Sequence, residues 1–345
     1  MQKLSWQKSK LPSDVKLTEI LAETKDMRSS SNGAAARDRT ISVQTGNISR
    51  SYPLKHKQKL RFLGAACFAL VLAAIFGHSL LTLINYAASS QLYSYILLIP
   101  FVSAYLLYIR RDQLPKIYSV DLPLAIVSLA IGLGILIFTY WLNFAGRAPS
   151  IGDRLTLLTL SFLCCLAAGG FFFLGRAWMR AAAFPLAYLI FLVPMPNAMT
   201  DALEQASAAA STEMANLLFH LSGMPFFRVG PVFQLPNITL EVAQECSGIR
   251  SSLVLFITSI LAANLFLKTT WRRFVLVAIV IPLGILRNGF RIFVIGLLCV
   301  HVGPQMIHSL IHRRGGPLFF VISLVPLLLV LWLLCKGDEQ TRFAE

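Results

Sequence analysis

The chain has 345 residues, of which 56% are hydrophobic and 14% are charged. A soluble domain of this length carries about a quarter charged residues, so the composition excludes an ordinary soluble enzyme, and the recurring apolar runs are long enough to cross a bilayer. The formal net charge of +15 does not predict nucleic-acid binding, because Lys and Arg cluster beside the apolar runs, as cytoplasmic anchors do.

Residues 1–60 are polar and basic and predict a disordered cytoplasmic tail. They contain no apolar h-region, so no cleavable signal peptide is expected. Residues 61–336 predict one all-α, polytopic membrane domain, and 337–345 a second cytoplasmic tail. The basic clusters place both termini in the cytoplasm. About eight transmembrane helices are expected, at 62–84, 93–109, 121–143, 155–175, 182–197, 247–267, from about 274, and at 316–335.

Residues 198–245 are the one sizeable extracytoplasmic segment that this topology predicts. Small, polar and apolar residues alternate at helical spacing over 200–222 and predict a short amphipathic helix. Aromatic and β-branched residues follow over 226–242, broken by glycine and Pro-Asn, and predict a β-hairpin-like insertion. This insertion leads the chain directly into Cys246.

The cysteines show neither a zinc-like spacing nor a disulfide framework. Most of the six lie inside apolar runs, where cysteine behaves as a small hydrophobe. Cys246 differs, because it opens a predicted span within Glu-Cys-Ser-Gly-Ile-Arg (245–250).

Two further groups are expected at the depth of Cys246. Arg291 lies 17 residues after 274, so a helix that starts on the inner side raises it by roughly 25 Å to the outer leaflet. His312 lies four residues before Gly316, where the last span begins on the outer side. The topology therefore predicts that a thiol, a guanidinium and an imidazole meet at the extracytoplasmic face.

These three groups suit covalent catalysis. A thiolate is a nucleophile, and a helix N-terminus with a nearby cation favours it. The imidazole of His312 can activate the thiol or protonate a leaving amine. The guanidinium of Arg291 can stabilise the oxygen of an attacked carbonyl, and a charged residue inside a span marks a functional site.

Other interpretations of these residues stay open. Arg287 and Arg250 compete for the guanidinium role, with Asn288, Glu245 and His308 as further supporting candidates. Arg291 could also extend to the interface or pair with a carboxylate such as Glu245. His308 and His312, at i and i+4, could hold a metal, but no third ligand has a suitable spacing, so neither a metal nor a cofactor is predicted.

Three stretches resemble the exosortase/archaeosortase family of membrane-embedded cysteine transpeptidases. They are Glu-Cys-Ser-Gly-Ile-Arg (245–250), Asn-Gly-Phe-Arg-Ile (288–292), and His312 before Gly-Pro-Leu-Phe-Phe (316–320). The resemblance implies a catalytic set of Cys246, Arg291 and His312. It also implies an inner-membrane enzyme whose substrates are secreted proteins with a C-terminal sorting signal: a short motif, typically Pro-Glu-Pro, a transmembrane helix and a basic cluster. Such work often accompanies exopolysaccharide production.

The resemblance implies cleavage near the motif, a thioester on Cys246 and transfer to an acceptor that the sequence does not name. Two alternatives remain at this stage. One is a transporter or polysaccharide-export component without covalent chemistry, which would carry more charged residues within its spans than this chain does. The other is a purely hydrolytic intramembrane protease, which would share the thioester.

Overall fold

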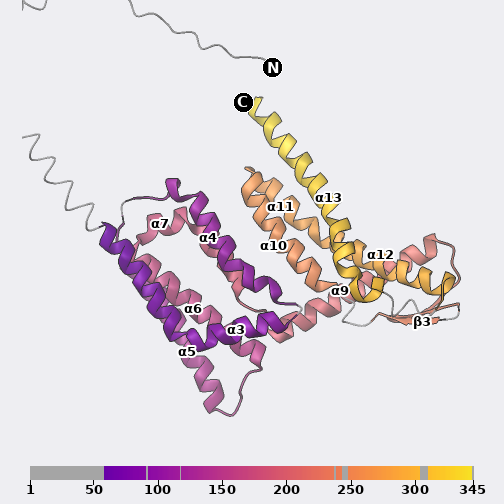
Figure 1. Ribbon diagram of the computed structural model, residues 1–345, viewed down its shortest axis with the longest axis horizontal. Helices are drawn as coiled ribbons and strands as arrows, with labels where there is room; N and C mark the ends of the chain where they lie inside the picture. The colour runs from indigo at the N-terminus through magenta and orange to yellow at the C-terminus, as the bar shows by residue number, and fades with distance from the viewer. Residues whose placement is uncertain are drawn as a thin grey trace, which may run out of the picture. The chain divides into compact units, whose positions relative to one another are not determined.

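The computed structural model describes residues 58–90, 92–116, 118–236, 238–242, 248–303 and 310–343, except the side chains of 310–319 and 338–343. The chain divides into two units, Met1–Leu60 and Arg61–Glu345. The second unit contains the helical bundle and a small sheet (Figure 1).

Helices make up most of the second unit, which confirms the predicted all-α, polytopic class. A first helix spans Gln58–Ile75. The others are α3 (Gly77–Ser89), α4 (Ile99–Ile109), α5 (Leu122–Phe144), α6 (Ile151–Phe173), α7 (Gly175–Ala181), α8 (Ala183–Tyr188), α9 (Asn197–Leu221), α10 (Ile249–Phe266), α11 (Thr270–Ala278), α12 (Val280–His301) and α13 (Leu310–Phe343). Short 3₁₀ helices are η1 (Ser94–Leu98), η2 (Arg111–Gln113) and η3 (Leu189–Leu192).

The predicted number of eight spans is not confirmed. Among the described residues, six helices are long and apolar enough to cross a membrane, or seven if one bent pair counts as a single span. The run predicted at 93–109 is Ser94–Ile109, an apolar helix that falls short of the length of the six.

The first predicted span is interrupted. A single helix was expected over 62–84, but it ends at Ile75 and α3 begins at Gly77 with a change of direction that Figure 1 shows. Phe76, at the break, is buried, and its ring packs edge-on against Phe162 at 5.6 Å between centroids. Packing of this ring and the low helix propensity of glycine favour the break.

The bent pair is Ala183–Leu192 and Asn197–Leu221, which meet at 88°. Pro194 and Pro196 lie in the break, as expected from the loss of two backbone donors. The new helix is held in place by α6: the Asp153 carboxylate accepts a hydrogen bond from the Asn197 backbone N–H at 2.9 Å, and Thr156 Oγ1 donates to the Pro194 carbonyl at 2.9 Å. Asp153 therefore caps α9 from a distant part of the chain.

Glycines let α12 lie against α9. A Cβ at Gly289 would come within 2.5 Å of Met214 Cγ, and a Cβ at Gly296 within 2.7 Å of Phe219 Cζ. Small residues allow such close approach between membrane helices. Phe219 is fully buried and also contacts Phe233 and Phe293, with ring centroids 5.3 and 5.2 Å away. This aromatic cluster fixes the sheet to α9 and α12.

The predicted hairpin is a three-stranded antiparallel sheet in the order β1-β2-β3. Its strands are β1 (Phe227–Val229), β2 (Val232–Leu235) and β3 (Ile238–Glu241). Val229 pairs with Val232, and Leu235 pairs with Ile238, so both connections are tight. The end of β3 leads through Val242 to the segment 243–247.

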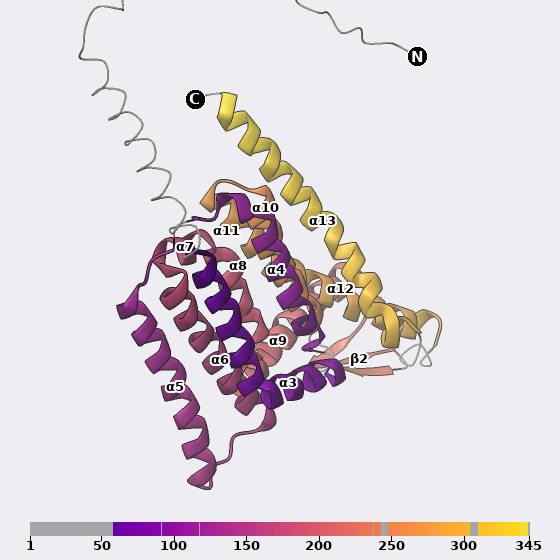
Figure 2. The ribbon, with the colours of Figure 1, turned by 60° about the vertical axis from the view of Figure 1, so that its left-hand side comes forward.

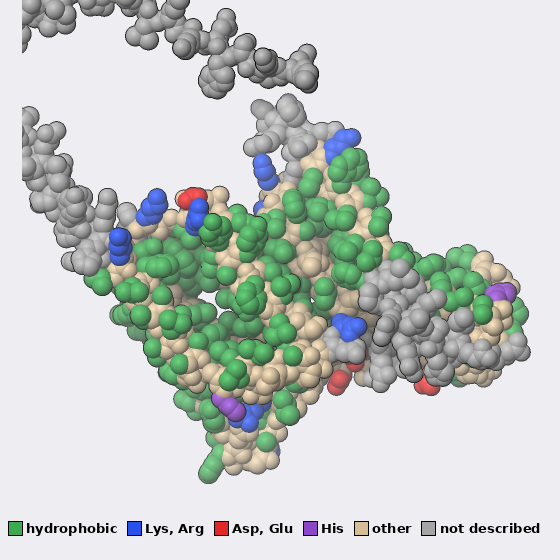
Figure 3. All heavy atoms as spheres, in the orientation of Figure 1, with side chains coloured by type: hydrophobic (Ala, Val, Ile, Leu, Met, Phe, Trp, Pro, Cys, Tyr) green, Lys and Arg blue, Asp and Glu red, His purple; other side chains and the backbone are tan. Residues whose placement is uncertain are grey.

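Hydrophobic side chains are spread over the face in Figure 3, and most of the Lys and Arg side chains visible there lie along the edge where η2, α7 and the far end of α10 lie. Exposed cations on or directly after these elements include Arg111, Arg176, Arg180 and Lys268. An apolar band with cations at one edge is typical of a protein that sits across a bilayer. The first residue of α10 lies roughly 25 Å from this edge, the length of an 18-residue helix.

Candidate active site

The start of α10 requires glycine. Gly248 precedes the helix with φ 69°, in the left-handed region that other residues adopt at a cost. A Cβ at this position would also lie 2.8 Å from Asn288 Oδ1 and 3.4 Å from Arg287 Nη2. Gly248 thus allows both the backbone turn and close contact with α12.

Arg287 joins α12 to the start of α10. Its Nη2 donates to the Gly248 carbonyl at 3.1 Å and lies 2.9 Å from Ser252 Oγ. The Arg287 residue is only 7% exposed, and its Nη1 has no hydrogen-bond partner among the described residues. A buried guanidinium needs compensating contacts, and two of those found here fix the first turn of α10.

The neighbouring residues of α12 complete this contact. Asn288 is 2% exposed and packs against Gly248. Gly284, one turn earlier, faces Ser252, since a Cβ there would lie 2.7 Å from Ser252 Oγ. Arg287 and Asn288, which were predicted as supporting residues, therefore both contact Gly248 within the Glu-Cys-Ser-Gly-Ile-Arg motif.

The other two predicted arginines lie on the same helices. Arg291 is half-buried on α12, one helical turn beyond Arg287. Arg250 is exposed in the first turn of α10. Arg287, which was predicted as a supporting residue, donates hydrogen bonds to Gly248 and Ser252 at the start of α10.

Three predicted residues, Glu245, Cys246 and His308, lie outside the described residues. His312 falls in the first turn of α13, whose backbone is described, while its side chain is outside the description. Both ribbon views place the start of α13 beside α12 (Figures 1 and 2). The backbone that carries His312 thus begins near the helix that carries Arg291.

Ser252 was not predicted as a site residue. Its position offered a signal, because residues four apart share a helix face and Ser252 follows Gly248 by that interval. The pattern did not distinguish Ser252 from Ser251, however. Only the packing of α12 selects the residue whose hydroxyl meets Arg287.

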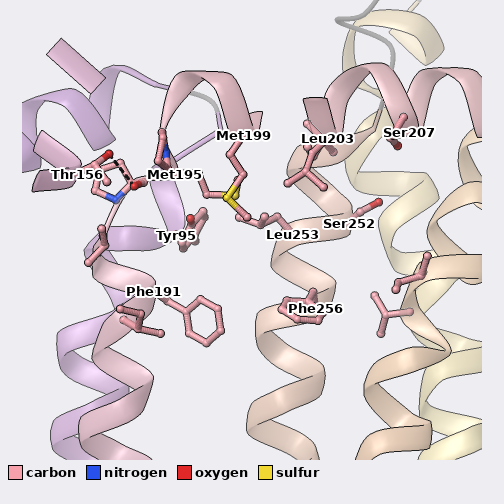
Figure 4. A pocket seen from close by; sticks show the side chains of 18 of the residues that line it. Tyr95, Thr156, Phe191, Met195, Met199, Leu203, Ser207, Ser252, Leu253 and Phe256 are labelled. Atoms are coloured by element: carbon pink, nitrogen blue, oxygen red, sulfur yellow. Dashed lines mark hydrogen bonds between the residues drawn. The ribbon is translucent and has the colours of Figure 1, made fainter. Parts of the chain in front are cut away.

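An apolar groove of about 850 Å³ lies next to this contact (Figure 4). Side chains from six elements line it, among them Tyr95, Thr156, Phe191, Leu203, Leu253 and Ile285. Ile249 and Ser252, at the start of α10, also form part of its wall. The groove therefore reaches Ile249, within the Glu-Cys-Ser-Gly-Ile-Arg motif, and the first turn of α10.

A second pocket of about 490 Å³ lies between α9 and the sheet, and most of its wall is apolar, with Ala208, Pro231 and Val242 among the lining residues. We call it the polar pocket because its lining also includes four polar side chains, Gln205, Thr212, Glu213 and Arg228. Arg228 forms two hydrogen bonds with the Glu213 carboxylate, at 3.0 and 2.6 Å. These bonds raise the pKa of Arg228 above its ordinary value. Val242, which lines this pocket, is the residue directly before segment 243–247.

The family model described as transmembrane exosortase matches residues 85–329. The chain belongs to the transmembrane exosortase family. The match covers α4 to α12 and most of α13, and with them the contact between α10 and α12. No curated protein and no solved structure shows a significant match to the chain.

Membership of the family assigns this exosortase a general role as a membrane-bound protease or transpeptidase. The several apolar helices agree with a multi-pass membrane protein. Within the part of the chain that the structure describes, no group of three or more His, Cys, Asp or Glu side chains could hold a metal ion.

Substitution of Gly248 tests the contact between α10 and α12. We expect Gly248→Ala to lower the free energy of unfolding of the exosortase by about 1–3 kcal/mol more than Gly223→Ala does, the typical cost of overpacking. Gly223 is a matched control, because it has the same φ of 69° and no atom within 4 Å of its added Cβ. Unfolding in detergent measures the free energy of unfolding of both variants. An equal decrease in the two variants would contradict the contact between Gly248 and α12.

Proposed function

We propose that this exosortase is a cysteine transpeptidase that cleaves C-terminal sorting signals of secreted proteins at the extracytoplasmic face. The hydrogen bonds from Arg287 to Gly248 and Ser252 support it most. They connect the Glu-Cys-Ser-Gly-Ile-Arg motif at the start of α10 with the Arg-Asn-Gly-Phe-Arg motif of α12.

Chain geometry keeps the proposed nucleophile close to α12. Cys246 precedes Gly248 by two residues, which span at most about 7 Å. Arg291 follows Arg287 by one turn, or about 6 Å along the helix axis. In this proposal Arg287 holds the backbone of the motif, and Arg291 faces the substrate carbonyl.

The proposed reaction has two steps. The Cys246 thiol gives its proton to His312, and the thiolate attacks the carbonyl carbon of the scissile peptide bond. Arg291 stabilises the oxygen as it gains negative charge. The C–N bond breaks, the leaving amine takes the proton from His312, and the acyl group remains on Cys246 as a thioester. An acceptor nucleophile then attacks the thioester, gives its proton to His312 and releases the thiolate.

The proposed substrates have the tripartite tail that the family resemblance implies: a short motif such as Pro-Glu-Pro, a transmembrane helix and a basic cluster. The cation-rich edge at the far end of α10 supports an orientation in the inner membrane with that edge in the cytoplasm. The start of α10 then faces outward. Mass spectrometry of the new C-terminus identifies the acceptor: a free carboxylate means water, and an added group means transfer.

Replacing the proposed nucleophile should abolish processing. We expect Cys246→Ala to remain inserted and folded while substrates accumulate with their C-terminal helix attached, because no other group forms the thioester. Immunoblotting of a model substrate measures this, with Cys67→Ala, at an exposed cysteine far along the chain, as the control. Normal processing by Cys246→Ala would contradict the proposal.

A second substitution tests the guanidinium. Arg291→Lys should lower kcat by roughly 10²–10³-fold, the usual loss when an oxyanion donor is removed, because a point charge does not replace a planar fork of donors. Arg180→Lys, at the opposite edge, serves as the control. If Arg291→Lys keeps full activity while Arg287→Lys loses it, the proposed role passes to Arg287.

A further inference from the structure

The apolar groove and the polar pocket lie on different faces of α9. Within each cavity, the residues that α9 contributes are three or four positions apart, so each set lies on one face of the helix. The groove is lined by Leu203, Ser207 and Ala210, and the pocket by Gln205, Ala208 and Thr212. Ala210 lines both cavities. A ligand that fills the two cavities would therefore cross over α9 near this alanine.

Both cavities approach the Cys246 motif, from opposite sides along the chain. Val242 lines the polar pocket and is the last described residue before segment 243–247. Ile249 and Ser252 line the groove and follow that segment. A ligand that extends from one cavity to the other would thus contact the described residues that flank Cys246 in the sequence.

The groove selects an apolar occupant at membrane depth. Candidate spans form its walls, including α6 and α10. Two of its polar side chains are engaged within the protein: Thr156 Oγ1 donates to the Pro194 carbonyl, and Ser252 Oγ lies in hydrogen-bond contact with Arg287. The small side chains of Ser207 and Ala210 leave room for the close approach that packing between membrane helices requires.

The polar pocket distinguishes a polypeptide from a phospholipid. Its lining has one cation and one carboxylate, and these are paired: Arg228 binds Glu213 through two nitrogens, and its Nε donates to the Gly230 carbonyl at 2.8 Å. A neutralised guanidinium offers little to a phosphate. Gln205 and the Thr212 hydroxyl oxygen can instead hydrogen-bond the amide groups of an extended peptide.

We propose that the two cavities form one bipartite binding site for a membrane-anchored polypeptide. The groove receives one flank of the transmembrane helix of the sorting signal, and the polar pocket receives the extended segment that precedes this helix. The junction between the two segments then lies between Val242 of the pocket and Ile249 of the groove. This inference rests on the proposed function and adds where, and through which surfaces, the substrate binds.

Photocrosslinking in the full-length protein tests the groove. A benzophenone amino acid replaces Leu203 in a Cys246→Ser background, in vesicles that also contain a model protein ending in Pro-Glu-Pro, an apolar helix and an Arg cluster. Leu217 is the matched control, since it lies on α9, is 51% exposed against 39% for Leu203, and does not line the groove. We expect the variant with benzophenone at position 203 to form an adduct with the model protein, and the variant with benzophenone at position 217 to form none.

The outcomes separate this inference from the proposed function. Processing of the model protein by the wild type, with lipid adducts alone at position 203, would overturn the bipartite site and leave the function intact. An adduct with the model protein but no processing would retain the site and overturn the function. Absence of both would overturn both.

A kinetic variant tests the polar pocket. Ala208→Leu fills part of it, and we expect KM for the model protein to rise roughly tenfold, equivalent to about 1.4 kcal/mol of binding, with kcat unchanged. Ala202→Leu is the control, because it lies on the same helix outside the pocket lining. An unchanged KM in Ala208→Leu would show that the substrate does not use the pocket.

Discussion

The buried guanidinium of Arg287 is the interaction on which this site depends. It ties α12 to the carbonyl of Gly248 and to Ser252, and thereby sets the position from which α10 begins. Hydrogen bonds to a charged group contribute about 1.5–3 kcal/mol each, but burial of the charge costs a comparable amount or more. Arg287 therefore contributes specificity of arrangement more than net stability, which suits a residue that positions a reactive segment.

Close packing of α9 against α12 makes this arrangement part of a larger frame. Gly289, directly after Asn288, meets Met214 of α9, and Phe219 holds the sheet to both helices. The same α9 begins at the bend after Pro196, where Asp153 caps it. Displacement of α9 would therefore disturb the sheet that leads into Cys246 as well as the helix that carries Arg291.

Much of this organisation could be predicted from the sequence. Apolar runs gave the membrane class and most spans, and Pro194 and Pro196 gave the break before α9. The interruption at Phe76 could not be predicted, because a ring that packs against Phe162 leaves the hydrophobic pattern of the run unchanged. The sequence also could not show which arginine binds Gly248, because nothing in the sequence distinguishes Arg287, Arg291 and Arg250 for this role. Only the packing of α12 against α10 brings Arg287 to Gly248 and Ser252.

Detection of the acyl-enzyme would test most directly whether Cys246 is the nucleophile. The wild-type protein is mixed with a model sorting-signal protein, quenched with acid during turnover, digested and analysed by mass spectrometry. We expect a peptide in which Cys246 is linked to the newly formed C-terminus of the substrate. Hydroxylamine should cleave this link, as it cleaves a thioester. Continued processing with Cys246 unmodified at every time point, or an adduct on another residue, would show that Cys246 is not the nucleophile.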